Sequence, residues 1–184
     1  MANRSRKPDV KPGVAGATRR VAPTAENVKI TYQWLAYDQL SADQLHDILA
    51  LRQAVFIVEQ RCPYLDIDGL DRHAWHLLGR DADGALVAYL RAVQPGSKYP
   101  EPSIGRVVTH PNVRDQGIGR ELMTIGIENV EKLFPGSPIR LSAQVYARGF
   151  YQSFGFETAG QPYDEDGIPH VEMLRIPEKE STER

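Results

Sequence analysis

The sequence has one cysteine, no long apolar run and no strong excess of either charge. Cys62 stands alone among 184 residues, which excludes an internal disulfide and a zinc site built from several cysteines. A single thiol is typical of a protein in a reducing cytoplasm. No segment approaches the roughly 20 consecutive apolar residues of a membrane-spanning helix, so we expect no membrane partner. The formal net charge of −2 does not favour nucleic-acid binding by the whole chain.

Basic residues gather at the start of the chain. Residues 1–29 contain seven lysines and arginines, two acidic residues, three prolines and two glycines, without apolar periodicity. This composition predicts a disordered basic tail, which either tethers the protein weakly to nucleic acid or membrane or only solubilises it. Residues 177–184 are expected to form a polar C-terminal tail. A single folded domain over residues 30–176 remains.

The domain shows strand and helix patterns in alternation. Ser41 and Gln44 have capping-box spacing, which predicts a helix start. Asp83-Gly84 predicts a hairpin turn between two strands. The expected strands span residues 30–37, 74–79, 85–93, 104–109, 139–144, 156–159 and 171–176, and the expected helices begin at Ser41, Gly117 and Ala147. This order predicts an α/β fold with a mixed sheet.

Two details concern packing. The segment Cys62–Gly69 is expected to be a loop, packed through its apolar members Tyr64, Leu65 and Ile67. The helix after Gly117 is expected to bury one apolar face, made of Ile118, Leu122, Ile125, Val130 and Leu133.

The segment Val107–Arg120 carries the clearest chemical signal. A buried strand ends in a proline turn, and a loop containing Gly117 and Gly119 enters a helix. The first turn of a helix offers free N–H groups and positive partial charge, so the segment suits a diphosphate, although a tight strand-to-helix turn alone would look the same. No Gly-Lys-Ser/Thr follows, and Leu122 stands where a dinucleotide fingerprint needs glycine.

The spacing Arg114-x-x-Gly117-x-Gly119 resembles the signature of the GNAT N-acetyltransferase superfamily. A second block of that superfamily follows, in which Gln144 ends a strand and Phe150–Phe156 reads Phe-Tyr-Gln-Ser-Phe-Gly-Phe. Within the superfamily, the chain resembles the ElaA-like proteins over residues 32–176. The matching segments lie at 51–69, 76–79, 104–107, 143–144 and 165–170.

The resemblance implies a GNAT fold, with a mixed central sheet flanked by helices, and acetyl-CoA as cosubstrate. It implies that backbone groups of Val107, Val108 and Thr109 pair with pantetheine. It further implies that the pyrophosphate and nearby parts of the cofactor are held by Arg114, Asp115, Gln116, Gly117, Ile118, Gly119, Arg120 and Gln144. Many relatives carry asparagine where this chain has Gln144, which changes the reach of the amide.

Tyr151 aligns with the tyrosine that many GNAT enzymes use as general acid toward the departing thiolate; a core tyrosine with a satisfied hydroxyl is the alternative. Glu59 is our candidate base, because partial burial would raise its pKa, with Glu101 and Asp68 as rivals. A carboxylate exposed at a helix end is the alternative for Glu59. We expect no metal, and we expect His76 and His170 to be hydrogen-bonded residues, either of which could line the acceptor pocket.

The resemblance therefore implies a cytoplasmic acetyl-CoA-dependent N-acetyltransferase. Direct transfer to a primary amine in a ternary complex is expected, with the acceptor unidentified. A homodimer is compatible with the resemblance. The alternative function is a CoA-sensing or partner-binding module that kept the fold and lost turnover.

Overall fold

The computed structural model describes residues 29–177. The predicted basic tail and the polar C-terminal tail lie outside these residues, except for residues 29 and 177 themselves. No helix within residues 29–177 combines the length and apolar character needed to cross a membrane.

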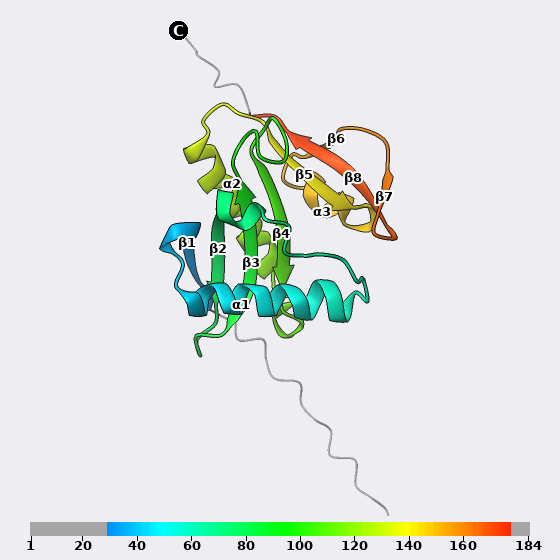
Figure 1. Cartoon of the computed structure of the whole chain (residues 1–184). Helices are drawn as coiled ribbons and strands as arrows, with labels where there is room; N and C mark the ends of the chain where they lie inside the picture. Colours follow the sequence, from blue (N-terminus) through cyan, green and yellow to red (C-terminus); the bar gives the residue numbers. More distant parts are fainter. Residues whose placement is uncertain (1–28, 178–184) are drawn as a thin grey trace, which may run out of the picture.

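The described chain forms one mixed sheet with helices on both faces (Figure 1). The strands lie side by side in the order β1-β2-β3-β4-β5-β8-β6, and β7 pairs with β8. Only the β4–β5 pair is parallel. The strand bounds are β1 Thr31–Ala36, β2 Ala74–Arg80, β3 Leu86–Val93, β4 Ser103–Thr109, β5 Ile139–Gln144, β6 Glu157–Thr158, β7 Tyr163–Glu165 and β8 Ile168–Arg175. The α/β fold with a mixed sheet, predicted from the sequence, is confirmed.

Two helices cover opposite faces of the sheet, because strand residues alternate between them. Helix α1 (Ala42–Arg52) packs on the face that carries Leu78, Tyr89 and Val108. Helix α2 (Ile118–Leu133) packs on the face that carries Leu77 and Leu90. The short helix α3 (Arg148–Gln152) follows β5. This two-sided core fixes the sheet against which the functional loops are placed.

The predicted helix starts are mostly accurate. Ser41 caps α1, and the capping box with Gln44 forms through bonds of 2.9 and 3.1 Å. After Arg52 the chain continues as a π-helical segment over Gln53–Glu59. The predicted apolar face of α2 needs one correction, since Leu133 is 40% exposed at the C-terminal end of the helix.

Two other expectations are wrong. Leu65 and Ile67 are 88% and 67% exposed, so apolar packing does not hold the loop that contains them. Strand β7 was not predicted, because its three residues, Tyr-Asp-Glu, lack an apolar pattern. Strand β8 begins at Ile168, three residues before its expected start, and the two strands form a hairpin through Asp166-Gly167.

The two parallel strands separate soon after they meet. The β4–β5 ladder contains only the pair Ser103↔Arg140, and Figure 1 shows the strands diverging beyond it. Strand β4 also carries a bulge: Tyr89 pairs with Val108, but Arg91 pairs with Gly105, so β4 has one extra residue there. Within this bulge Arg106 adopts a positive φ of 52°. The separation leaves one edge of β4 open.

Candidate active site

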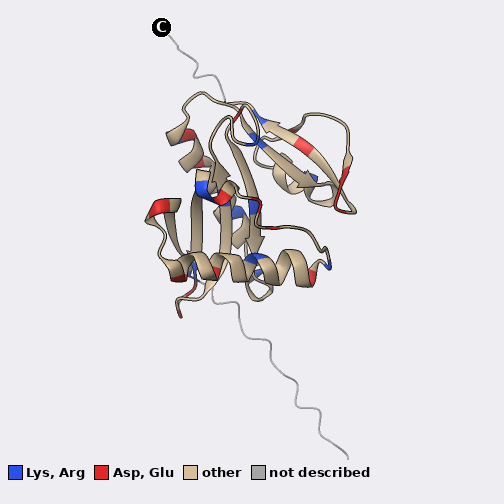
Figure 2. Ribbon diagram, in the orientation of Figure 1, with Lys and Arg blue, Asp and Glu red and all other residues tan. Residues whose placement is uncertain are grey.

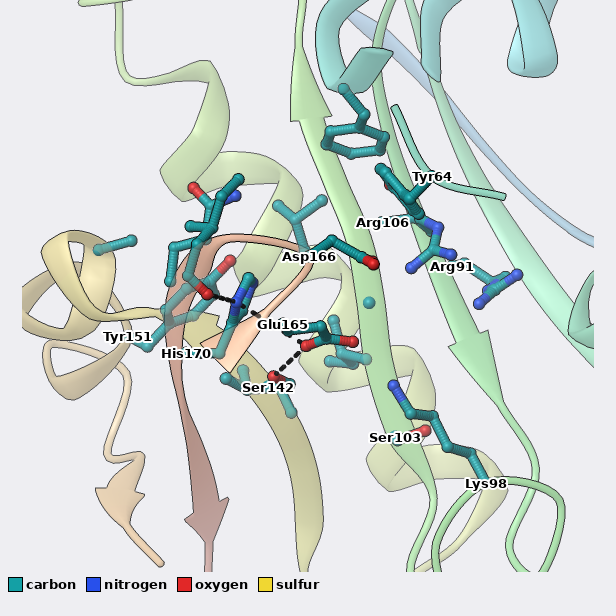
Figure 3. Close-up of a pocket in the computed structure, with 18 of the residues that line it drawn as sticks. Tyr64, Arg91, Lys98, Ser103, Arg106, Ser142, Tyr151, Glu165, Asp166 and His170 are labelled. Carbon is teal, nitrogen blue, oxygen red and sulfur yellow. Dashed lines mark hydrogen bonds and ion pairs between the residues drawn. The ribbon is translucent and has the colours of Figure 1, made fainter. Parts of the chain in front are cut away.

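A cavity of about 190 Å³ lies where β4 and β5 diverge (Figure 3). Its walls include Val107 on β4, Gln144 at the end of β5 and Tyr151 on α3. Figure 3 shows Tyr151 and His170 on the β5–β8 side, and Arg91 and Arg106 on the β3–β4 side. Residues that are far apart in the sequence therefore meet at the opening of the sheet.

The three strand residues predicted to bind pantetheine end β4. Val108 and Thr109 pair with β3, and the side chain of Val108 is buried in the core. Beyond Ser103 no β5 residue is paired with β4, which leaves the β5-facing edge of β4 open beside Val107, although the carbonyl of Thr109 already accepts hydrogen bonds from Arg114. Backbone groups need hydrogen-bond partners, and a linear amide ligand could supply them.

The predicted pyrophosphate loop leads into α2 without a side chain that caps the start of the helix. Gly117 precedes the helix with φ +80°, and no side chain caps the helix there. Asp115 also has a positive φ, of 60°. A Cβ atom at Gly119 would lie 3.9 Å from the ring of Phe150, in ordinary contact. The N–H groups of Arg120 and Glu121 bond the Gly117 carbonyl, while those of Ile118 and Gly119 have no backbone partner among the described residues and fit an anionic group of acyl-CoA.

Two polar side chains of this loop, those of Arg120 and Gln116, lie in different surroundings. Arg120 is exposed, and its guanidinium lies 5.5 Å from the centre of the Phe154 ring. Gln116 is exposed and donates to the carbonyl of Asn112 at 3.2 Å. Arg120 is therefore the arginine of this loop that has no carboxylate partner within 4 Å among the described residues.

Tyr151 is half-buried, and it packs with Phe150 and Phe156. Burial raises the pKa of Tyr151 to about 12, with a smaller contribution from Tyr146. The hydroxyl of Tyr151 forms no hydrogen bond with any group in residues 29–177. The hydroxyl of the buried Tyr89, by contrast, is hydrogen-bonded to His76. The phenol thus keeps its proton at neutral pH and has it available for a ligand in the cavity.

Glu59 does not have the environment that we expected. Its two carboxylate oxygens accept hydrogen bonds of 2.7 and 2.9 Å from Arg114. These bonds lower the pKa of Glu59, so the expected rise is wrong. Arg114 also donates to the carbonyl oxygen of Thr109 at 3.2 Å. Glu59 therefore holds Arg114 against the end of β4.

The two rival bases are also paired with arginine. Glu101 accepts bonds of 2.8 and 3.0 Å from Arg140, which lower its pKa. Burial alone would raise the pKa of Asp68, but the hydrogen bonds and charge of Arg91 outweigh it and lower the pKa to about 2. None of the three carboxylates proposed from the sequence is free to accept a proton at neutral pH.

A buried ion network holds the loop Cys62–Gly69 against the sheet. Arg52, which is fully buried, binds Asp66 and Asp71 at 2.8 and 2.7 Å. Arg91 binds Asp71 and Asp68 at 2.8 and 2.6 Å. Figure 2 shows the basic and acidic segments next to one another in this part of the molecule. Charge pairing, not apolar contact, places this loop at the cavity wall.

Gln144 and two of the histidines occupy defined positions. The Gln144 amide donates to Gln60 at 3.3 Å, and both residues line the cavity. His76 is fully buried and bonded to Tyr89 at 2.8 Å, as predicted. His170 lines the cavity, with its Nδ1 bonded to the Ile168 carbonyl at 2.8 Å.

Sequence reasoning missed the role of the β7–β8 hairpin. Glu165 and Asp166 from this hairpin line the cavity beside Ser142 of β5. The hairpin over residues 163–170 could have been predicted from Asp166-Gly167, a residue pair typical of hairpin turns. The hairpin was not predicted because the residues before the turn include Asp164 and Glu165, which do not form the apolar pattern of a strand.

Comparison with known proteins agrees with this geometry. A family model described as an acetyltransferase (GNAT) domain matches residues 52–176. The chain belongs to the GNAT family. Its predicted membership and its ElaA-like character are both confirmed by the relatives.

Two relatives of this GNAT chain are similar over most of their length. A UPF0039 protein of Synechocystis sp. is 44% identical over 151 residues, which cover 82% of this chain and 98% of that protein. ElaA of Escherichia coli is 43% identical over 148 residues, covering 79% and 96%. The crystal structure of that ElaA superimposes with a TM-score of 0.75 at 42% identity, covering 80% of this chain and 99% of the other.

A further GNAT structure carries a functional description. The crystal structure of an acyl-CoA N-acyltransferase from Pseudomonas aeruginosa has a TM-score of 0.77 and 38% identity, and covers 80% of this chain and 99% of that one. The GNAT domain implies an acyl-CoA cosubstrate, and the open edge of β4 together with the uncapped start of α2 fits one.

Proposed function

We propose that this GNAT protein is an acetyl-CoA-dependent N-acetyltransferase that transfers the acetyl group directly to a primary amine. The observation that carries the proposal is the cavity between the diverging strands β4 and β5, which Tyr151 and Val107 line together. A cysteine-linked intermediate is not part of it, because Cys62 is buried and donates to the Asp166 carbonyl at 3.3 Å. The single thiol also supports a cytoplasmic location.

Each part of the cofactor would meet a different element. Backbone groups of Val107–Thr109 would pair with pantetheine along the free edge of β4. The N–H groups of residues 115–120 would bind the pyrophosphate, with positive charge added by Arg120. Gln144 would exchange its bond to Gln60 for one to the ligand. Arg114, held by Glu59, would fix the end of β4 beside this loop.

Tyr151 would act as the general acid. Bound acetyl-CoA supplies an acetyl thioester, whose thiol is a good leaving group once protonated. The raised pKa of Tyr151 keeps the phenol protonated at neutral pH, so its proton would be in place for the sulfur as the C–S bond breaks and negative charge develops there. A backbone N–H of β4 would stabilise the oxyanion of the transition state.

The first experiment measures the thermal stability of the purified protein with acetyl-CoA, CoA or ATP. A ligand present at about 100 times its dissociation constant adds about 2.7 kcal/mol to the free energy of unfolding. Stabilisation by both CoA compounds and not by ATP is expected. No stabilisation by any of them would contradict acyl-CoA binding, and stabilisation without thiol release for any amine would favour the CoA-sensing module.

A further inference from the structure

The cavity has two walls of different electrostatic character. The arginines on the β3–β4 side are neutralised by aspartates: Arg91 by Asp68 and Asp71, and Arg106 by Asp66 and Asp68. Their guanidinium groups therefore offer little net charge to a ligand. The only other cationic side chain in the cavity lining is Lys98, which is exposed and lies 5.2 Å from the ring of Tyr99.

The opposite wall presents a carboxylate that pairs with no arginine of residues 29–177. Oε2 of Glu165 lies 3.2 Å from the Ser142 hydroxyl and 3.3 Å from the Tyr163 hydroxyl, and it accepts a hydrogen bond from this pair of hydroxyls, which are bonded to each other at 2.6 Å. The same oxygen lies 3.8 Å from Nδ1 of His170, which is already bonded to the Ile168 carbonyl. Oε1 of Glu165 has no partner among residues 29–177. Figure 3 shows Glu165 extending from the β7–β8 hairpin into the cavity.

This arrangement distinguishes Glu165 from the carboxylates suggested by the sequence. Glu59, Glu101 and Asp68 each accept at least two hydrogen bonds from arginine, and none of them is among the residues that line the cavity. Glu165 has a fixed orientation, because two hydroxyl groups hold one oxygen, and a free oxygen that faces the ligand space. A carboxylate of this kind suits a positively charged amine.

We propose that Glu165 binds the ammonium group of the acceptor and takes its proton, and that this acceptor is a compact primary amine without a carboxylate of its own. The inference rests on the proposed acetyl transfer and names the acceptor class for that cavity. The volume of about 190 Å³ suits a small molecule. Aromatic side chains around it provide a surface for an apolar body: Phe56, Tyr64, Tyr99 and Tyr146.

The absence of an acceptor carboxylate follows from the charges. Both cavity arginines already bind two aspartates each, and the Nε atoms that have no hydrogen-bond partner among residues 29–177 are buried, so an added carboxylate could reach a guanidinium only by disturbing these partly buried ion pairs. It would also lie in the same cavity as Glu165 and Asp166, which repel it. An amine without a carboxylate neither disturbs the arginine–aspartate pairs nor is repelled by Glu165 and Asp166.

The reaction balances with these residues. The ammonium gives one proton to Glu165, which releases it to solvent, and the neutral nitrogen attacks the acetyl carbonyl. A C–N bond forms and the C–S bond breaks. The sulfur receives a proton from Tyr151, and the phenol recovers one from the nitrogen as the amide forms. The products are an N-acetyl amine, CoA and one proton released to water.

The experiment uses three pairs of amines that differ by one carboxylate: tyramine and L-tyrosine, 2-phenylethylamine and L-phenylalanine, and cadaverine and L-lysine. Thiol release from acetyl-CoA is measured with the full chain for each. We expect at least one decarboxylated member to have a kcat/KM at least tenfold above that of its amino acid. A higher kcat/KM for the amino acids, or no thiol release with any amine in protein that binds CoA, would overturn the proposal.

The role of Glu165 is tested by Glu165→Gln, which keeps the acceptor for Ser142 and Tyr163 and removes the charge. We expect kcat/KM for the best amine to fall at least 50-fold while the dissociation constant of CoA changes less than twofold. Glu165→Asp should recover part of the loss. The matched control is Asp164→Asn, which removes a charge from the same hairpin and keeps the acceptor for the Gly167 N–H.

Asp164→Asn is expected to retain the wild-type kcat/KM. Equal losses in Asp164→Asn and Glu165→Gln would show a general effect of hairpin charge and overturn the assignment of Glu165, as would wild-type turnover by Glu165→Gln. Failure of the wild type to bind acetyl-CoA would instead remove the proposed acetyltransferase function, so the two failures are distinguishable.

Discussion

Glu59 and Arg114, which are 55 residues apart in the sequence, are joined by two hydrogen bonds of 2.7 and 2.9 Å. The pair connects the end of the π-helical segment to the loop before α2. Because Arg114 also bonds the carbonyl of Thr109, the pair attaches the last residue of β4 to two neighbouring elements. A residue suggested as a base thus has a positioning role.

This positioning role predicts a small coupling free energy between Glu59 and Arg114. Glu59→Gln and Arg114→Gln each break the pair, whose side chains are 40% and 37% exposed. A double-mutant cycle in urea denaturation should give a coupling free energy of about 0.5 kcal/mol, as for other partly exposed pairs. Thiol release by Glu59→Gln should stay within fivefold of wild type at saturating acetyl-CoA. A loss of 100-fold or more would restore Glu59 as the base.

Tyr151→Phe tests the general acid. The substitution removes only the hydroxyl, so the packing with Phe150 and Phe156 remains. General acid catalysis contributes typically about 10²- to 10⁴-fold, and we expect a fall in kcat of about 100-fold. Isothermal titration should show CoA affinity within twofold of wild type. Unchanged turnover would contradict the assignment.

The lowered pKa of Asp68 predicts that the folded protein loses stability at acid pH. Its carboxylate has a pKa lowered to about 2 in the folded protein, from 3.8 in the unfolded chain. A lowered folded-state pKa contributes stability above the unfolded-state pKa, and this contribution is lost as the pH falls from about 4 to about 2. The difference in unfolding free energy between wild type and Asp68→Asn should therefore shrink by about 2 kcal/mol between pH 6 and pH 2.

Urea denaturation at the two pH values measures this difference. Glu157→Gln is a suitable control, because Glu157 is exposed on the short strand β6. Its difference from wild type should be small at both pH values. A pH-independent difference for Asp68→Asn would show that the ion pair with Arg91 does not lower the pKa of Asp68.

The two glycines of the proposed pyrophosphate loop should respond differently to alanine. Gly117 has φ +80°, where an L side chain is strained, so Gly117→Ala should cost about 1 kcal/mol of unfolding free energy and weaken CoA binding. Gly119 lies within α2, and a Cβ atom there meets its nearest neighbour at 3.9 Å. Gly119→Ala should therefore be at least as stable as wild type. Equal destabilisation in thermal denaturation would contradict this reading.

Much of the framework could be predicted from local patterns. The capping box at Ser41, the strand Ile139–Gln144 and the helix after Gly117 depend on propensities and spacing within a few residues, and the structure has all three. The glycine loop and the tyrosine block were likewise recognisable, because each motif is short and continuous in sequence.

The chemical state of the carboxylates depended on contacts between distant segments. Glu59, Glu101 and Asp68 looked equivalent as acids near loops, but each meets an arginine 23 to 55 residues away. Nothing in the local sequence sets Glu165 apart from its acidic neighbours Asp164 and Asp166, yet the hairpin turns it into the cavity beside Ser142. Pairing and desolvation shift a pKa only over a few ångströms, and such distances are properties of the folded chain.

The sequence by itself determined the family, through its resemblance in short continuous motifs. It also determined the order of the main strands and helices and the loop that suits a diphosphate, since these follow from local hydrogen bonding and apolar periodicity. Only the tertiary structure decided which carboxylates are neutralised and which one faces the ligand space. That choice depends on the divergence of β4 and β5 and on the β7–β8 hairpin, which bring side chains together across the sheet where Coulomb energy and burial act.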